Sequence, residues 1–196
     1  MIRLNKPYAT KKGLTNIKKA IREGRLSGNG YFTKKSSSLL EKYLNTECTA
    51  LITHSCTASL EMAALLIEIK EGDEIIMPSY TFVSTANAFV LRGGVPVFVD
   101  IKKDTLNLNE DLIEDAITHK TKAIVVVHYA GVSCNMEKIS NIAKRNKLAL
   151  IEDAAQALGS EYKNRKLGTF GDLSAISFHE TKNIISGEGG ALIINN

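Results

Sequence analysis

Short apolar runs alternate with helical patterns along most of this chain. We predict strands at seven apolar runs: Ala50–Thr53, Glu74–Met77, Pro96–Asp100, Ala123–His128, Ala149–Glu152, Leu173–Phe178 and Gly190–Ile194. Apolar residues recur at helical spacing between these runs, which predicts helices over Thr57–Ile69, Ser84–Arg92, Asn109–Ile117 and Met136–Asn146. Strands that alternate with helices are typical of an α/β fold, here a mostly parallel seven-stranded sheet with helices on both faces. In such sheets, ligands bind at the carboxyl ends of the strands.

The first part of the chain has a different pattern. A helix is predicted over Leu14–Glu23, because Leu14, Ile17, Ala20 and Ile21 form one apolar stripe. Three glycines at positions 24, 28 and 30 then interrupt it, and a second helix is predicted over Thr33–Leu44 with Thr33 as its N-cap. We therefore divide the chain into a basic N-terminal helical segment, 1–46, and a large α/β domain, 47–196.

Charge is distributed unevenly between these two parts. The 196 residues carry a net charge of +4, but residues 1–46 contain 11 Lys and Arg against 2 Asp and Glu. A basic segment can attract an anionic ligand, although a solvated helix face is the simpler interpretation. No aromatic motif is interleaved with the basic residues, so we do not expect nucleic-acid binding. No apolar run approaches the roughly 20 residues of a membrane helix, so no membrane partner is expected either.

The cysteines and the N-terminal residues indicate the cellular compartment in which the protein is expected. Cys48, Cys56 and Cys134 are odd in number and far apart, which indicates neither a disulfide framework nor a zinc site. Residues 1–12 are polar and basic without an apolar core, so a secretory signal is not expected. Both observations favour the reducing cytoplasm.

Four segments are candidates for ligand binding, and two of them are loops that precede helices. Residues 53–59 are rich in Ser and Thr and lie at a helix start, where free backbone N–H groups suit a phosphate. An ordinary N-cap is the alternative explanation. Residues 78–82 follow a predicted strand, and Phe82 could lie flat on a planar ring. Taken alone, Phe82 is more typical of a core aromatic residue.

The other two signals each combine a charged residue with small neighbours. Asp153 follows an apolar strand and could pair with a cation, and Gln156 could bond a neighbouring oxygen. A helix-capping role for Asp153 remains open. Lys182 follows a strand and His179, and it precedes the glycines of Gly187–Gly190. In a dry, cationic pocket a lysine becomes a nucleophilic amine, whereas alone it would be an ordinary surface lysine. A phosphate cradle, a stacking aromatic ring, an Asp and a Lys are together the groups that pyridoxal phosphate needs.

Five stretches carry a resemblance to a known family. SCTASLEMAALL, DEIIMPSYTFVSTANAFVLRGG, VHYAGV, IEDAAQA and SFHETKN…GEGGAL resemble the DegT/DnrJ/EryC1/StrS sugar aminotransferases, over nearly all 196 residues. The resemblance implies the fold type I of pyridoxal-phosphate-dependent transferases, which is similar to aspartate aminotransferase. It also implies a homodimer, and further residues in a C-terminal small domain that this sequence does not contain.

The resemblance also implies a role for each matching residue. Lys182 would form the Schiff base with pyridoxal 5'-phosphate and later move the proton. Asp153 would pair with the pyridine nitrogen, Gln156 would meet the ring hydroxyl, and Phe82 would stack on the ring. The phosphate would be held by Thr57, Ala58 and Ser177. His179 and Glu188 match motif positions without an assigned role.

The implied reaction transfers an amino group from an amino acid, glutamate, to a 4-keto-6-deoxy nucleotide sugar. The product would be dTDP-4-amino-4,6-dideoxygalactose or a close relative, used for lipopolysaccharide or enterobacterial common antigen. A deoxysugar dehydratase of the same family would have His where Lys182 stands. An inactive fragment that at most binds cofactor or a partner chain is a further alternative. An unrelated nucleotide-binding domain is disfavoured, because the sequence contains neither GxGxxG nor GxxxxGK[ST].

Overall fold

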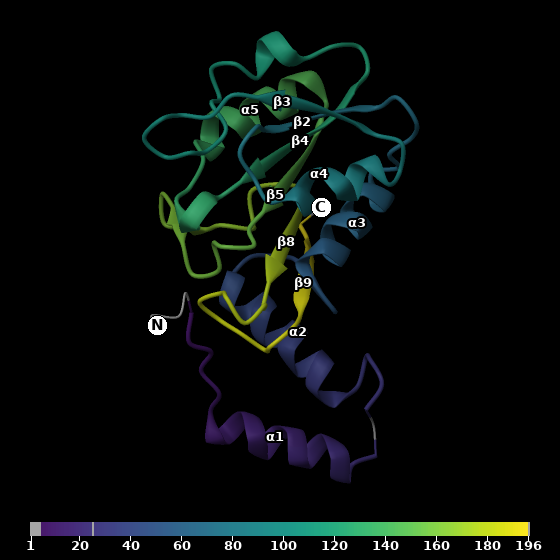
Figure 1. Cartoon of the computed structure of the whole chain (residues 1–196), viewed down its shortest axis with the longest axis vertical. Helices are drawn as coiled ribbons and strands as arrows, with labels where there is room; N and C mark the ends of the chain where they lie inside the picture. The colour runs from purple at the N-terminus through teal and green to yellow at the C-terminus, as the bar shows by residue number, and fades with distance from the viewer. Residues whose placement is uncertain (1–4, 25, 196) are drawn as a thin grey trace.

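A seven-stranded sheet forms the centre of the molecule in the computed structural model (Figure 1), which describes residues 5–24 and 26–195. The strand order is β1-β9-β8-β5-β4-β2-β3. Its strands are β1 (Thr49–Thr53), β2 (Glu74–Pro78), β3 (Val95–Val99), β4 (Thr121–Val127), β5 (Ala149–Asp153), β8 (Leu173–Ser177) and β9 (Gly190–Ile194). Only β9 runs antiparallel to its neighbours β1 and β8, while the pairs from β8 to β3 are parallel. The predicted α/β fold with a mostly parallel sheet is therefore confirmed.

Helices cover both faces of this sheet. They are α2 (Tyr31–Leu44), α3 (Cys56–Leu66), α4 (Val83–Val90) and α5 (Met136–Asn146), and a further helix, α1 (Lys11–Arg22), precedes them in the chain. Buried residues of α3 and α4 join one hydrophobic core, and those of α2 and α5 join the other. The faces of the central strands β2, β4, β5 and β8 are thus covered by helices, whereas a ligand can bind at the strand ends.

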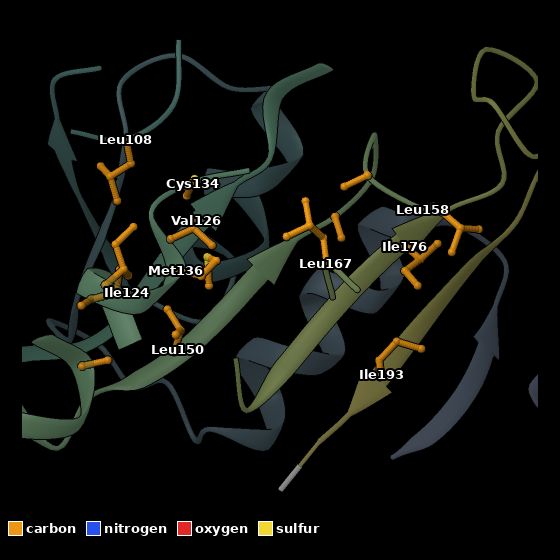
Figure 2. Close-up of a cluster of buried hydrophobic side chains, with 14 of the residues drawn as sticks. Leu108, Ile124, Val126, Cys134, Met136, Leu150, Leu158, Leu167, Ile176 and Ile193 are labelled. Carbon is orange, nitrogen blue, oxygen red and sulfur yellow. The ribbon is translucent and has the colours of Figure 1, made fainter. Parts of the chain in front are cut away.

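The central strand β4 shows how one sequence serves two cores. Ala123 and Val125 lie in the core beneath α3 and α4, whereas Ile124 and Val126 lie in the core beneath α5. Successive side chains of a strand point to opposite faces, so a strand that is covered on both faces must be apolar throughout. Figure 2 shows Ile124 and Val126 beside Met136 of α5. This explains why β4 reads as a continuous apolar run.

Helix α1 stands apart from the sheet (Figure 1) and buries none of its residues. Its apolar stripe is solvent-exposed, with Leu14, Ile17 and Ile21 each more than half exposed. Helix α2 differs, because Leu40 and Leu44 are buried in the core. The predicted division at residue 46 stays a prediction.

Three local predictions were wrong. No α-helix forms over Asn109–Ile117, where only a single 3-10 turn occurs at Glu114–Ala116 (η1). The side chain of Asn109 accepts a hydrogen bond from the N–H of Asp111, and such local bonds compete with a helix. Thr33 is not an N-cap, because α2 already begins at Tyr31 with Gly30 in the N-cap position. Helix α3 begins at Cys56 rather than Thr57, since the side chain of Ser55 caps it.

A small hairpin was not predicted. Strands β6 (Glu161–Tyr162) and β7 (Arg165–Lys166) pair antiparallel beside the main sheet. Lys163 and Asn164 between them both have positive φ, 49° and 63°. A two-residue turn with positive φ at both positions matches the twist of a hairpin, but it usually carries glycine, so the sequence gives little sign of it.

Candidate active site

A cavity of about 380 Å³ opens at the carboxyl ends of β4, β5 and β8. The starts of α3 and α4 and the loop between β8 and β9 complete its wall. This volume is in the usual range of small-ligand sites, and the location at the strand ends is the one that the sequence predicts. Its lining includes Thr57, Phe82, Asp153, Gln156, Ser177, His179, Lys182 and Glu188. The structure therefore gathers all but one of the sequence-predicted site residues.

The exception is Ala58, which is buried and does not line this cavity. Its backbone N–H donates to Oγ of the N-cap Ser55 at 3.1 Å. That bond competes with any anion for the same N–H. The neighbouring Thr57 does line the cavity, and its hydroxyl donates to Oγ of Ser84 at 2.9 Å. Thr57 and Ser84 thus place two hydroxyl groups at the start of α3, where the helix dipole favours an anion.

Asp153 ends β5 and is only 5% exposed. Its Oδ2 accepts a hydrogen bond from the hydroxyl of Thr85 at 2.7 Å, and its Oδ1 accepts one from the N–H of Ala155 at 3.2 Å. Burial raises the pKa of Asp153, and the two hydrogen bonds and the charge of Lys182 offset that effect only in part. A buried carboxylate with so few donors is stabilised by a cation that enters the cavity.

Glu152 precedes Asp153 but points to the other face of the sheet, where it is fully buried. Its carboxylate accepts hydrogen bonds from the N–H groups of Gly168, Phe170 and Gly171, at 2.6–2.8 Å. Nε2 of His128 lies 2.8 Å from Oε2 of the same carboxylate. Burial alone would raise the pKa of Glu152, but these bonds lower it below its ordinary value.

The tautomer of His128 follows from its second nitrogen. The N–H of Cys134 donates to Nδ1 of His128 at 3.3 Å, so Nδ1 is the acceptor and Nε2 carries the proton toward Glu152. The pair holds the end of β4 to the end of β5. Sequence reasoning missed it, although both residues lie in the quoted motifs VHYAGV and IEDAAQA.

Lys182 follows β8 in a turn in which its N–H donates to the carbonyl of His179 at 2.9 Å. Its side chain lines the cavity, and its charge lowers the pKa values of Asp153 and of the Cys56 thiol against the opposing effect of burial. The amine is therefore electrostatically coupled to the carboxylate at the cavity floor. At the same loop, Nδ1 of His179 lies 2.8 Å from the Thr181 hydroxyl.

Phe82 is 71% exposed and is not a core residue. It occupies the N-cap position of α4, on the loop after β2, and lines the cavity. An exposed phenylalanine on a cavity wall presents an apolar ring to a ligand, which would remove that ring from water. The interpretation of Phe82 as a core aromatic is wrong.

Gln156 holds the loop that follows β4. Its Oε1 accepts a hydrogen bond from the N–H of Ala130 at 2.7 Å, so its Nε2 is left as a donor. On the same loop, Oδ1 of Asn107 accepts the N–H of Tyr129 at 2.9 Å. Sequence reasoning did not single out Tyr129, Ser84, Thr85 or Cys56, because none of them stands out from its neighbours in the sequence.

This set of groups fits pyridoxal phosphate. A nearly unexposed carboxylate with a raised pKa suits a ring nitrogen that carries a proton, and the exposed face of Phe82 suits a flat ring. The helix start with Thr57 and Ser84 suits a phosphate, and Lys182 supplies an amine for the aldehyde. These groups come from the end of β5, the starts of α3 and α4 and the loop after β8, at one edge of the sheet.

The comparison with known families agrees with this geometry. A profile of the DegT/DnrJ/EryC1/StrS aminotransferase family matches residues 7–196. The GDP-perosamine synthase of Escherichia coli O157:H7 is 36% identical over 189 residues, which cover 96% of this chain and 52% of that protein.

Solved structures agree as well. The aminotransferase TlmJ from Streptoalloteichus hindustanus superposes with a TM-score of 0.94 at 31% identity, over 100% of this chain and 53% of that one. Spr1654 from Streptococcus pneumoniae, whose structures include a PLP-form and a PMP-form, superposes with a TM-score of 0.92 at 30% identity. The superposition covers 53% of the PLP-form and 100% of this chain. This chain thus spans about half the length of these relatives.

Proposed function

Because this chain belongs to the DegT/DnrJ/EryC1/StrS aminotransferase family, we propose that its cavity binds pyridoxal phosphate for the amination of a nucleotide sugar. The observation that carries the proposal is the pairing of Lys182 with the buried Asp153 in one cavity. The bound cofactor supplies an electron-accepting ring that stabilises negative charge on the substrate carbon.

Each residue then has a distinct task. Lys182 would hold the cofactor through its amine, and the same amine, when free, would carry a proton to and from the substrate carbon. Asp153 holds the ring nitrogen in its protonated form, and Thr85 orients that carboxylate. Phe82 covers one ring face, and Nε2 of Gln156 donates to the ring oxygen while its Oε1 binds Ala130. Thr57, Ser84 and Ser177 would bind the phosphate, whereas Ala58, whose N–H is bonded to Ser55, does not line the cavity.

The substrates that we propose are glutamate as amino donor and a 4-keto-6-deoxy nucleotide sugar as acceptor. The product would be dTDP-4-amino-4,6-dideoxygalactose or a close relative. The presence of a lysine at position 182, rather than a histidine, supports amine transfer over dehydration. The similarity to a GDP-perosamine synthase supports a nucleotide sugar as the acceptor. The name of that relative contains GDP rather than dTDP, so the nucleotide can differ within the proposed class of acceptors.

The homodimer and the cytoplasmic location are also proposals. Several apolar side chains of α3 and α4 are exposed, among them Leu65, Leu66 and Leu91, and a second copy would cover them. All three cysteines are free thiols, which is consistent with a reducing compartment. Among the described residues, no helix combines the length and apolar composition that crossing a membrane requires.

Absorbance and peptide mapping test the cofactor site. The protein is incubated with pyridoxal phosphate, reduced with borohydride and digested, and we expect the cofactor mass on the peptide that contains Lys182. Lys182→Ala should lose this adduct, whereas Lys144→Ala on the exposed face of α5 should keep it. Labelling that is unchanged in Lys182→Ala would contradict the proposal. In a separate sample that is neither reduced nor digested, glutamate should convert the bound cofactor to its aminated form, which is followed by absorbance; a chain that binds cofactor without this conversion would be non-catalytic.

A further inference from the structure

Two tyrosines meet at the mouth of the cavity. The hydroxyl oxygens of Tyr80 and Tyr129 lie 2.9 Å apart, and their ring centroids are 4.9 Å apart at an interplanar angle of 51°. Tyr80 lies on the loop after β2, and Tyr129 follows β4, which is adjacent to β2 in the sheet. Tyr80 is 44% exposed, and Tyr129 lines the cavity. The roles given above to the cofactor-binding residues leave this pair unused.

The loop that carries Tyr129 is held in a strained conformation. Ala130 has φ 52° and ψ 22°, in the left-handed region that a residue with a side chain rarely adopts. Gln156 and Asn107 hold the backbone on either side of this position through the N–H groups of Ala130 and Tyr129. Strain of this kind is often retained at functional sites. The loop is therefore pre-organised to present Tyr129.

Tyr129 lines the same cavity as Lys182, so a substrate that reacts at Lys182 lies close to this pair. The reacting carbon of a nucleotide sugar belongs to its sugar ring, so the residues that share a cavity with Lys182 face the sugar rather than the base. Two rings tilted at 51° do not offer one flat platform to a planar base. They do offer apolar faces to the C–H groups of a sugar, and the paired hydroxyls provide both a donor and acceptor lone pairs.

We infer that Tyr80 and Tyr129 bind the sugar ring of the nucleotide-sugar substrate and contribute to the choice of sugar. This inference rests on the proposed function. In the free protein the two hydroxyls bond each other, and a sugar hydroxyl inserts as a third partner. One such hydrogen bond corresponds to about a tenfold change in affinity.

The two half-reactions separate this inference from the proposed function. The protein, as its gene encodes it and loaded with pyridoxal phosphate, is first mixed with glutamate. The aminated protein is then mixed with dTDP- and GDP-linked 4-keto-6-deoxyhexoses. In Tyr129→Phe and Tyr80→Phe, we expect the rate of the first half-reaction to be unchanged. In the second half-reaction, half-saturation should require about tenfold more keto sugar. Calorimetry should show the same loss for the nucleotide sugar and none for the free nucleoside diphosphate.

A control variant and several contrary outcomes complete the test of this inference. Tyr31→Phe, at the start of α2, should match the unsubstituted protein in every measurement. Sugar affinity that is unchanged in the double variant Tyr80→Phe/Tyr129→Phe would overturn the inference. If the reaction with glutamate is weakened to the same extent, the pair acts on the cofactor and not on the sugar. If affinity for the free nucleoside diphosphate falls to the same extent, the pair binds the nucleotide and not the sugar. An unsubstituted protein that aminates neither sugar would instead refute the proposed function.

Discussion

The hydroxyl of Thr85 donates a 2.7 Å hydrogen bond to Oδ2 of Asp153, across 68 residues of sequence and from α4 to β5. Thr85 is fully buried, and its own oxygen also lies 2.7 Å from the hydroxyl of Thr81. The bond opposes the effect of burial on the pKa of Asp153. It therefore favours the ionised form of the carboxylate that we assign to the ring nitrogen.

Replacing Thr85 by Val should weaken cofactor binding. Without the hydroxyl, the pKa of Asp153 rises further, and a neutral carboxyl group pairs poorly with a protonated ring. We expect roughly tenfold weaker binding of pyridoxal phosphate, from the loss of one bond to a charged group, in a fluorescence titration. Thr85→Ser retains the hydroxyl and should bind within about twofold of the unsubstituted protein. Equal affinity in Thr85→Val would show that Asp153 needs no such support.

Phe82 and Phe89 should respond to truncation in opposite ways. Phe89→Ala removes a fully buried side chain and should cost about 3–5 kcal/mol of unfolding free energy, measured by urea denaturation. Phe82→Ala removes a 71% exposed ring and should change stability by less than about 0.5 kcal/mol, while binding of pyridoxal phosphate weakens. A stable Phe82→Ala protein with undiminished cofactor affinity would remove Phe82 from the site.

The sheet could be predicted because its central strands are buried on both faces and are largely apolar, as β4 is. The 109–117 segment could not, since its apolar spacing suits a helix while Asn109 bonds the backbone locally. The residues with strong chemical character, Lys182 and Asp153, were found from their motifs. Thr85 and Tyr129 were not, because their roles depend on partners that only the folded chain brings near.

Substituting Glu152 should change how stability depends on pH. The pKa of Glu152 is lowered in the folded protein, so its contribution is complete above the unfolded value of about 4.3 and is lost as the pH falls toward the folded value. Glu152→Gln should abolish that part of the acid sensitivity. It should also cost about 3 kcal/mol at pH 7, because its NH₂ group must face backbone N–H donors.

To check this prediction, the unfolding free energies of the unsubstituted protein and of Glu152→Gln are measured from pH 3 to pH 8 and subtracted from each other. Asp153 has a raised pKa, so its contribution has the opposite sign and is lost as the pH rises, but it is common to both proteins and cancels. Glu137→Gln removes an exposed ion pair with Lys163 and should change stability by less than about 1 kcal/mol. A difference that does not vary with pH would contradict the assignment to Glu152.

Gly190 is required by a close approach of two backbones. A Cβ atom at this position would lie 2.4 Å from the carbonyl carbon of Ser55 and 2.5 Å from the nitrogen of Cys56. Those atoms form the cap and first residue of α3, where we place the phosphate. The glycine at position 190 therefore lets β9 approach the start of α3.

Gly190→Ala should therefore impair stability and cofactor binding together. Backbone atoms cannot move aside as a flexible side chain does, so β9 and the start of α3 must separate, which breaks ladder bonds of β9 to β1 and β8. We expect a loss of at least about 3 kcal/mol in thermal unfolding and weaker binding of pyridoxal phosphate. Gly28→Ala, where a Cβ meets no atom within 4 Å, should change neither by a measurable amount. If Gly190→Ala unfolds at the same temperature as the unsubstituted protein, the close approach does not constrain the start of α3.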